Sequence, residues 1–167
     1  MTTSAAGVIV VDTLEDATDR RLVVHRSINA PAERLFQACT VPSRLSEWWG
    51  PPGFTQPVYE IDLRSGGAMY YAMTGPDGIV YGMTGEVRQV TSPYTLVFTS
   101  EALTPGGEVA LETETRFDFE PDIDTTKVTV AHRVTAVHDS GRGYLAGMPC
   151  AWLEKLDRLA GLTEKVR

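Results

Sequence analysis

The chain has 167 residues, a formal net charge of -7, and hydrophobic side chains at 43% of its positions. This is the length of one ordinary domain, which buries about 70% of the surface of its unfolded chain and has room for an internal cavity. A net negative charge repels polyanions, so nucleic acid and acidic membrane surfaces are disfavoured as partners. We therefore expect neither nucleic-acid binding nor membrane binding.

The two cysteines, Cys39 and Cys150, lie far apart in the sequence and lack the spacing of a metal site. This usage is typical of a reducing cytoplasm; a disulfide between them is possible but not implied. The N-terminus has no basic segment, and its apolar run at residues 8–11 is far too short to span a bilayer. We therefore expect a cytoplasmic protein.

Residues 1–19 form an N-terminal extension that is small and polar apart from this run. It could be a frayed arm, an additional edge strand or a contact with a second copy in a homodimer, and the sequence leaves all three open. A single domain is expected over residues 20–164. Its first strand is predicted at residues 22–28, which are rich in β-formers.

Two short helices are predicted after this strand. Pro31 fits the first turn of one helix, which turns Leu35 and Phe36 inward. The second is predicted at residues 43–49 and ends in the Gly-Pro-Pro-Gly run at residues 50–53, which cannot continue any regular element.

Six further strands are predicted, separated by turns rich in glycine and proline. They are expected at residues 58–63, 68–73, 79–90, 95–100, 108–119 and 127–136. With the first strand they make a sheet of seven strands, in which every strand after the first is joined to the next by a hairpin. Apolar and charged residues alternate along residues 109–119, so this sheet should have one buried and one solvated face.

The one long helix is predicted at residues 141–161. Its apolar residues recur at steps of three and four, namely Leu145, Met148, Trp152, Leu156 and Leu159. Residues 154, 155, 157 and 158 are charged and are assigned to the opposite, solvent-exposed side of the helix. Pro149 predicts either a kink or a regular helix that begins near Met148. We expect the apolar side of this helix to cover the sheet.

Five motifs occur in order along the chain. They are Trp48-Trp49-Gly50-Pro51; Asp62-Leu63-Arg64-Ser65-Gly66-Gly67; Gly75-Pro76-Asp77-Gly78; Gly85-Glu86-Val87 with Val90; and Trp152 with Leu156-Asp157-Arg158-Leu159. By these motifs the chain resembles the START-like (SRPBCC, Bet v-like) superfamily over residues 22–162. It is most similar to the branch homologous to the activator of the heat-shock protein 90 ATPase.

This resemblance implies an α+β helix-grip fold. A curved antiparallel seven-stranded sheet would surround a long C-terminal helix, with two short helices after the first strand and a cavity between helix and sheet. Bacterial members of the branch mostly resemble binders of small molecules, so the expected partner is a hydrophobic small molecule. No cofactor is expected, and the three histidines form no metal motif.

Aromatic and methionine side chains on neighbouring strands either form an ordinary core or line an adaptable apolar pocket, and the sequence leaves both open. The residues expected to line such a pocket are Trp49, Phe54, Tyr71, Met73, Tyr81, Met83, Phe117, His132, Met148 and Trp152. The assignment depends on strand register, because a shift of one residue would turn these side chains outward. Trp49, Phe54 and Met148 would close one end of the pocket.

His132 shares the parity of Val128, Val130 and Val134, so it should face the interior. It is either a buried histidine bonded to a neighbour or a group that orients a ligand or transfers a proton. Tyr81, and Arg116 or Arg133, are candidates for further polar contacts near the rim.

No catalytic residue is assigned, because the chain has no nucleophile elbow and its Gly66-Gly67 turn lacks the lysine of a phosphate loop. Binding of an apolar or amphipathic ligand without a defined reaction is the first hypothesis. The alternative is an enzyme of the cyclase or hydratase kind, with His132 and a tyrosine as acid and base. An ATPase-activating co-chaperone with a chaperone partner ranks last, because a single small domain lacks the additional domain of the eukaryotic co-chaperones.

Overall fold

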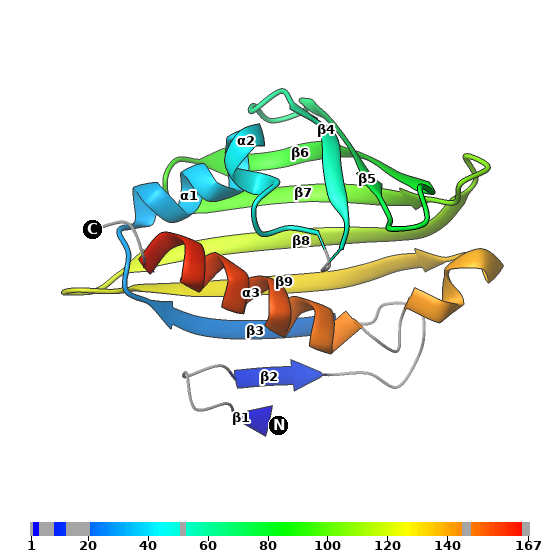
Figure 1. Cartoon of the computed structure of the whole chain (residues 1–167). Coiled ribbons are helices and arrows are strands. Elements are labelled where there is room, and N and C mark those ends of the chain that lie inside the picture. The colour runs from blue at the N-terminus through cyan, green and yellow to red at the C-terminus, as the bar shows by residue number, and fades with distance from the viewer. Residues whose placement is uncertain (1, 4–8, 13–20, 51–52, 145–147, 165–167) are drawn as a thin grey trace.

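The structure is a computed structural model of the chain (Figure 1). It describes residues 2–3, 9–12, 21–50, 53–144 and 148–164. For residues 2–3, 9–12, 56–57, 144 and 148–150 it describes the backbone but not the side chains.

In the described part of the chain, one antiparallel sheet of nine strands forms the larger layer, with spatial order β1-β2-β3-β9-β8-β7-β6-β5-β4. The strands are β1 (Thr2–Thr3), β2 (Ile9–Asp12), β3 (Arg21–Ile28), β4 (Thr55–Ile61), β5 (Ala68–Thr74), β6 (Val80–Thr91), β7 (Thr95–Leu103), β8 (Val109–Pro121) and β9 (Thr126–Val137). From β4 to β9 each strand pairs with the next along the chain, and β3 pairs with β9. The predicted seven-stranded sheet is therefore β3 to β9, and the predicted fold class is confirmed.

The strands β1 and β2 lie outside this set and extend the sheet at its β3 edge. The backbone of β2 pairs with β3 in antiparallel register, with Val10 opposite Val24. Three roles were possible for the N-terminal extension, and in the structure β2 forms the additional strand.

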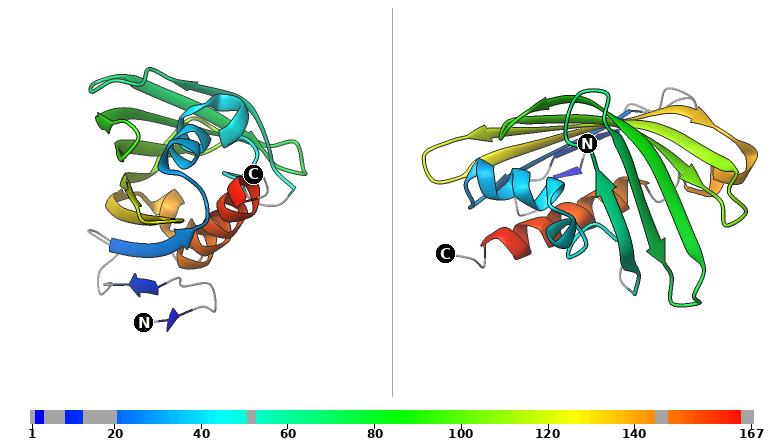
Figure 2. Two further views of the ribbon diagram at one scale, coloured as in Figure 1. Left: turned by 90° about the vertical axis from the view of Figure 1, so that its left-hand side faces the viewer. Right: turned by 90° about the horizontal axis from the view of Figure 1, so that it is seen from above.

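The sheet curves, and α1, α2 and α3 all lie on one of its faces (Figure 2). On β8, Leu111, Phe117 and Phe119 are buried whereas Arg116 is exposed, as the alternation predicts. The strand pairing shifts register between Ala102 and Leu103 and again near Glu112. Such irregularities bend long strands and increase their twist, which allows this sheet to wrap around a helix.

The first two helices are α1 (Ala32–Thr40) and α2 (Pro42–Leu45). The prediction of a second helix at residues 43–49 is wrong in extent, because α2 has four residues. Beyond it, the backbone N–H of Trp48 donates to the carbonyl of Leu45 at 3.2 Å, a tight turn that ends the helix. The indole N–H of Trp48 donates to the carbonyl of Ala38 at 2.8 Å and fixes this turn against α1.

The prediction that the last helix starts at residue 141 is also wrong. A 3-10 helix, η1 (Asp139–Tyr144), comes first, and the regular helix is α3 (Met148–Glu164). A Cβ atom on Gly141 would lie 1.9 Å from the carbonyl oxygen of Ala110, so β8 passes too close for any side chain there. Pro149 falls in the first turn of α3, where its missing N–H costs no helical hydrogen bond. The alternative of a regular helix beginning near Met148 is therefore confirmed.

The helix α3 covers the concave side of the sheet (Figures 1 and 2). Its residues Trp152, Leu156 and Leu159 are buried in the core that it shares with the sheet. Burial of such side chains stabilises the fold by about 1.5 to 3 kcal/mol each. Within the described part of the chain, no helix combines the length and the apolar character needed to cross a membrane.

Candidate functional site

A cavity of about 440 Å3 lies between the sheet and α3. Its walls come from strands β5 to β9, from α3 and from the segments on either side of residues 51–52. Small residues of β7, namely Ser100 and Ala102, line the cavity here and leave room that larger side chains would fill. The volume falls in the range of about 300 to 1,000 Å3 that is usual for ligand sites.

The structure brings together most of the residues expected at the pocket. Those that line the cavity are Trp49, Phe54, Tyr71, Met73, Tyr81, Met83, His132 and Trp152. Their placement follows from the strand register, which pairs Tyr71 with Met83 and Met73 with Tyr81 across β5 and β6. The side chain of Met148 lies outside the described residues.

Phe117 is not on the cavity wall, which corrects its predicted position. It is 1% exposed and lies in the core between the rings of Trp152 and Phe119, with centroid distances of 5.9 and 6.0 Å. The alternation placed it on the correct face of β8, but it lies beyond the end of the cavity. Arg116 is also a correction, because its side chain is on the opposite face and pairs with Asp118 at 2.7 Å.

Several further residues line the cavity beyond those that the sequence predicts. They are Gly82, Phe98, Ser100, Ala102, Leu103, Leu111, Thr113, Thr115, Ala151 and Lys155. Thr113 and Thr115 share the parity of Leu111 and Phe117, so the alternation along β8 was a signal that could have identified them. The charge of Lys155 predicts a position on the solvent-exposed side of the helix, whereas the structure places it on the cavity wall.

His132 is joined to the neighbouring strand by a hydrogen bond between its Nδ1 and the Oγ1 of Thr115, at 2.8 Å. The two residues are directly opposite each other in the β8–β9 register. Burial lowers the pKa of His132 to about 3, and the positive charge of Lys155 contributes. The imidazole is therefore neutral at physiological pH, and its Nε2 has no hydrogen-bond partner among the described residues.

Lys155 reaches into the cavity from α3. Its Nζ lies 4.2 Å from the centroid of the Trp49 ring and 4.7 Å from that of Trp152, so two indole faces contact the ammonium group. Burial lowers the pKa of Lys155 to about 8, and the nearby charge of Arg158 adds to this effect. No carboxylate of the described residues pairs with this ammonium group.

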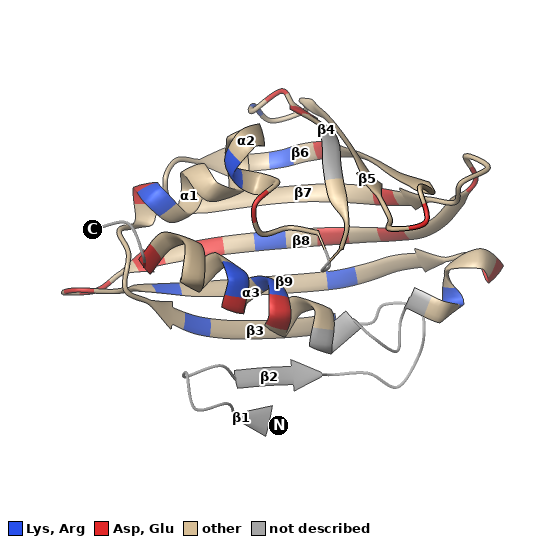
Figure 3. Ribbon diagram, viewed as in Figure 1, with Lys and Arg blue, Asp and Glu red and all other residues tan. Residues whose placement is uncertain are grey.

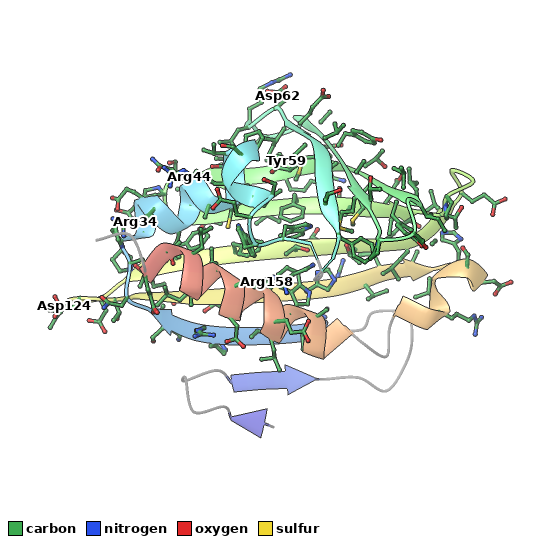
Figure 4. All side chains as sticks on the ribbon, viewed as in Figure 1. Arg34, Arg44, Tyr59, Asp62, Asp124 and Arg158 are labelled. Atoms are coloured by element: carbon green, nitrogen blue, oxygen red, sulfur yellow. The ribbon has the colours of Figure 1, made fainter. Side chains whose placement is uncertain are left out.

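Arg158, one turn further along α3, is engaged elsewhere (Figure 4). Its Nε donates to the carbonyl oxygen of Trp48 at 2.9 Å, which ties the helix to the turn after α2. Trp49, next in that turn, packs edge to face against Trp48 and Tyr71, with centroid distances of 5.3 and 6.0 Å. Trp49 therefore both packs the corner before the sheet and lines the cavity.

Cys39 and Tyr71 are two further reactive groups that are buried in the core. Cys39 is a free, buried cysteine, and burial raises the pKa of its thiol. Burial also raises the pKa of Tyr71, whose hydroxyl donates to the sulfur of Met83. In the part of the chain that the structure describes, no three His, Cys, Asp or Glu side chains gather in a way that could hold a metal ion.

The fold is similar to that of several solved bacterial proteins. The Ms6760 protein of Mycobacterium smegmatis is 25% identical, with a TM-score of 0.72 over 92% of this chain and 96% of that one. A protein from Rhodobacter sphaeroides is 23% identical, with a TM-score of 0.75 over 95% and 100% of the two chains. One from Arthrobacter aurescens is 21% identical, with a TM-score of 0.77 over 94% and 93%.

None of the curated proteins compared with the chain matches it. The family model described as activator of Hsp90 ATPase homolog 1-like protein matches residues 29–164. This match runs from the end of β3 to the last residue of α3. The resemblance inferred from the five motifs is thereby confirmed, and the chain belongs to this family, a branch of the START-like superfamily.

Proposed function

We propose that this protein binds an apolar or amphipathic small molecule in the cavity between the sheet and α3, without a defined reaction. The observation that carries the proposal is the cavity of about 440 Å3 itself. The walls of this cavity are mainly apolar, and removal of apolar surface from water is favourable. A ligand with an apolar body would cover this surface.

The chemistry of the walls supports an apolar ligand. Aromatic, aliphatic and methionine side chains make up most of the lining, and methionine adapts its shape to different partners. Apart from the hydroxyls of Tyr71 and Tyr81, the polar groups of the lining come from β7, β8, β9 and α3, namely Ser100, Thr113, Thr115, His132 and Lys155. A mostly apolar site with a few polar groups that orient the ligand is typical of small-molecule binding sites.

Binding is favoured over turnover by the state of His132. A cyclase or hydratase would need this imidazole to exchange a proton near neutral pH, whereas its pKa is about 3. Its hydrogen-bond partner is the hydroxyl of Thr115, which does not titrate in that range. A screen of purified protein against thioester, lactone and polyketide-like substrates should therefore find no turnover. Turnover that His132→Ala abolishes would contradict this proposal.

The direct test uses Nile red, a neutral dye that fluoresces in apolar surroundings. The native protein should bind the dye saturably, and the urea-unfolded protein should not. Native mass spectrometry of protein purified from its host should show a bound molecule and give its mass. If the folded protein binds no dye and carries no ligand, the proposal is wrong, and the domain is better interpreted as an interaction module.

A further inference from the structure

One cation in the cavity wall, Lys155, pairs with no anion of the residues that the structure describes. Lys155 is partly buried, and its ammonium group contacts the rings of Trp49 and Trp152 rather than a carboxylate. A charged group in apolar surroundings is costly unless it is paired, and contact with aromatic faces offsets only part of this cost. Within the described part of the chain, Lys155 thus has no negatively charged partner in the site.

The surroundings of Lys155 are suited to one small anionic group. His132 packs on the same indole, with its ring centroid 5.2 Å from that of Trp152, so ammonium and imidazole are near each other. Because the hydroxyl of Thr115 occupies Nδ1, the free ring nitrogen is Nε2. In the tautomer in which Thr115 donates, Nε2 carries the proton and can donate a second hydrogen bond to an anion.

We propose that the ligand is a monocarboxylate with an apolar body, and that its carboxylate pairs with the ammonium group of Lys155 beside His132. This inference rests on the proposed function and names the ligand class for the same cavity. The apolar body would extend from the carboxylate toward Tyr71, Met73, Tyr81 and Met83 on β5 and β6. The site thus has a polar end against α3 and β9 and an apolar end against the curved part of the sheet.

A dianion such as a phosphate monoester fits this site less well. Among the described residues one lysine lines the cavity, and Arg158, whose charge acts on Lys155, already donates its Nε to the carbonyl oxygen of Trp48. Charged residues of both signs are interspersed along β8 and α3, and the protein carries a net charge of -7 (Figure 3). One ammonium group within an acidic protein is matched in charge by a single carboxylate.

The experiment measures displacement of Nile red by two ligands of equal chain length, dodecanoate and dodecanol. Dodecanoate should displace the dye from the native protein at a concentration about tenfold lower than dodecanol, because charge-assisted hydrogen bonds are stronger than neutral ones. In Lys155→Met, which keeps an unbranched side chain one atom shorter and removes its charge, the ratio should fall to about one. The matched control is Lys127→Met, an exposed lysine of β9, which changes the net charge equally and should keep the native ratio.

Equal displacement by the acid and the alcohol in the native protein would overturn this inference while leaving the proposed binding function intact. A preference for the acid that survives Lys155→Met would also overturn it. Failure of the native protein to bind the dye or either ligand would instead remove the proposed function. If Lys155→Met does not fold, a crystal structure of the native protein with dodecanoate decides the question. The carboxylate should then lie within hydrogen-bond distance of the Nζ of Lys155, and a carboxylate at the Tyr81 end would refute the inference.

Discussion

The indole of Trp152 meets that of Trp49 edge to face, with ring centroids 5.6 Å apart and ring planes at 85°. Trp152 belongs to α3, whereas Trp49 lies in the turn after α2 and contacts Tyr71 of β5. The long helix, the short helical segment and the sheet therefore meet in one aromatic cluster. The same cluster forms a wall of the cavity, so the stability of the fold and the shape of the site depend on the same contacts.

The first prediction concerns Trp152, which is 3% exposed. Replacing it with alanine removes its contacts with Trp49, Phe117 and His132 and should destabilise the protein by about 3 to 5 kcal/mol. Urea denaturation measures this change. The control is Glu154→Ala on the exposed side of α3, which should change stability by no more than about 0.5 kcal/mol. An unchanged unfolding midpoint for Trp152→Ala would contradict the packing of α3 on the sheet.

The second prediction concerns Met83, which lines the cavity from β6. Met83→Trp should fill part of the cavity and weaken Nile red binding about tenfold or more, equal to about 1.4 kcal/mol. Its stability should stay within about 1.5 kcal/mol of the native value, because the added ring enters existing space. Val80→Trp adds the same indole to the outer side of β6, where the side chain is half exposed, and should leave dye binding unchanged. Dye titrations with equal affinity for the native protein and Met83→Trp would show that the dye binds elsewhere.

The third prediction is a pH dependence of stability that arises from Lys155. Its pKa falls from an ordinary value of 10.5 to about 8 on folding, so between these values the unfolded chain holds a proton that the folded chain has released. The free energy of unfolding then rises with pH, by at most about 1.4 kcal/mol per pH unit. Below pH 8 Lys155 is protonated in both the folded and the unfolded state. Burial of its charge then lowers the free energy of unfolding by an amount that does not change with pH. Lys155→Met should therefore be more stable than the native protein at neutral pH.

This advantage of Lys155→Met should be constant below about pH 8 and shrink as the pH rises above it. The native protein must be compared with Lys155→Met because burial raises the pKa of both Cys39 and Tyr71. These two groups lower stability at high pH, and they do so equally in the native protein and the variant. Of the other groups near Lys155, His132 is neutral throughout, and Arg158 is present in both proteins. An advantage that does not change between about pH 7 and 10 would mean that Lys155 is not desolvated.

The fourth prediction concerns the proton on His132. With a pKa of about 3, its imidazole should not titrate between about pH 5 and 8, the range in which an unperturbed histidine changes charge. The chemical shift of its Cε1 proton should accordingly stay constant across this range. A titration midpoint near pH 6 would contradict the burial of the ring and reopen the enzyme hypothesis.

The fifth prediction tests the hydrogen bond that holds this ring. Thr115→Val removes the hydroxyl bonded to Nδ1 while keeping the shape of the side chain, and should cost about 1 kcal/mol of stability. Thr113→Val, two residues earlier on the same face of β8, makes the same chemical change without breaking that bond. Equal unfolding midpoints for the two variants would show that the bond to His132 contributes nothing specific.

Local patterns in the sequence determined the order of elements and the face to which each side chain belongs. Alternation along residues 109–119 separated Leu111 and Phe117 from Arg116, because side chains along a strand point to opposite faces in turn. Glycine and proline turns fixed the hairpins of β4 to β9, because few other residues adopt the required backbone angles. Helical spacing identified Trp152, Leu156 and Leu159 as the side of α3 that packs on the sheet.

Tertiary structure alone decided where the cavity begins and ends. Phe117 and His132 both face inward on neighbouring strands, yet only His132 reaches the cavity, because the distance between a helix and a curved sheet varies along the strands. Lys155 lies three residues after Trp152 and four before Leu159, so its spacing belongs to the packed side although its charge indicated the wet one. A long charged side chain at the border of an apolar stripe can point either to the solvent or to the interior. The positions of the Trp49 and Trp152 rings, which only folding brings together, direct it inward.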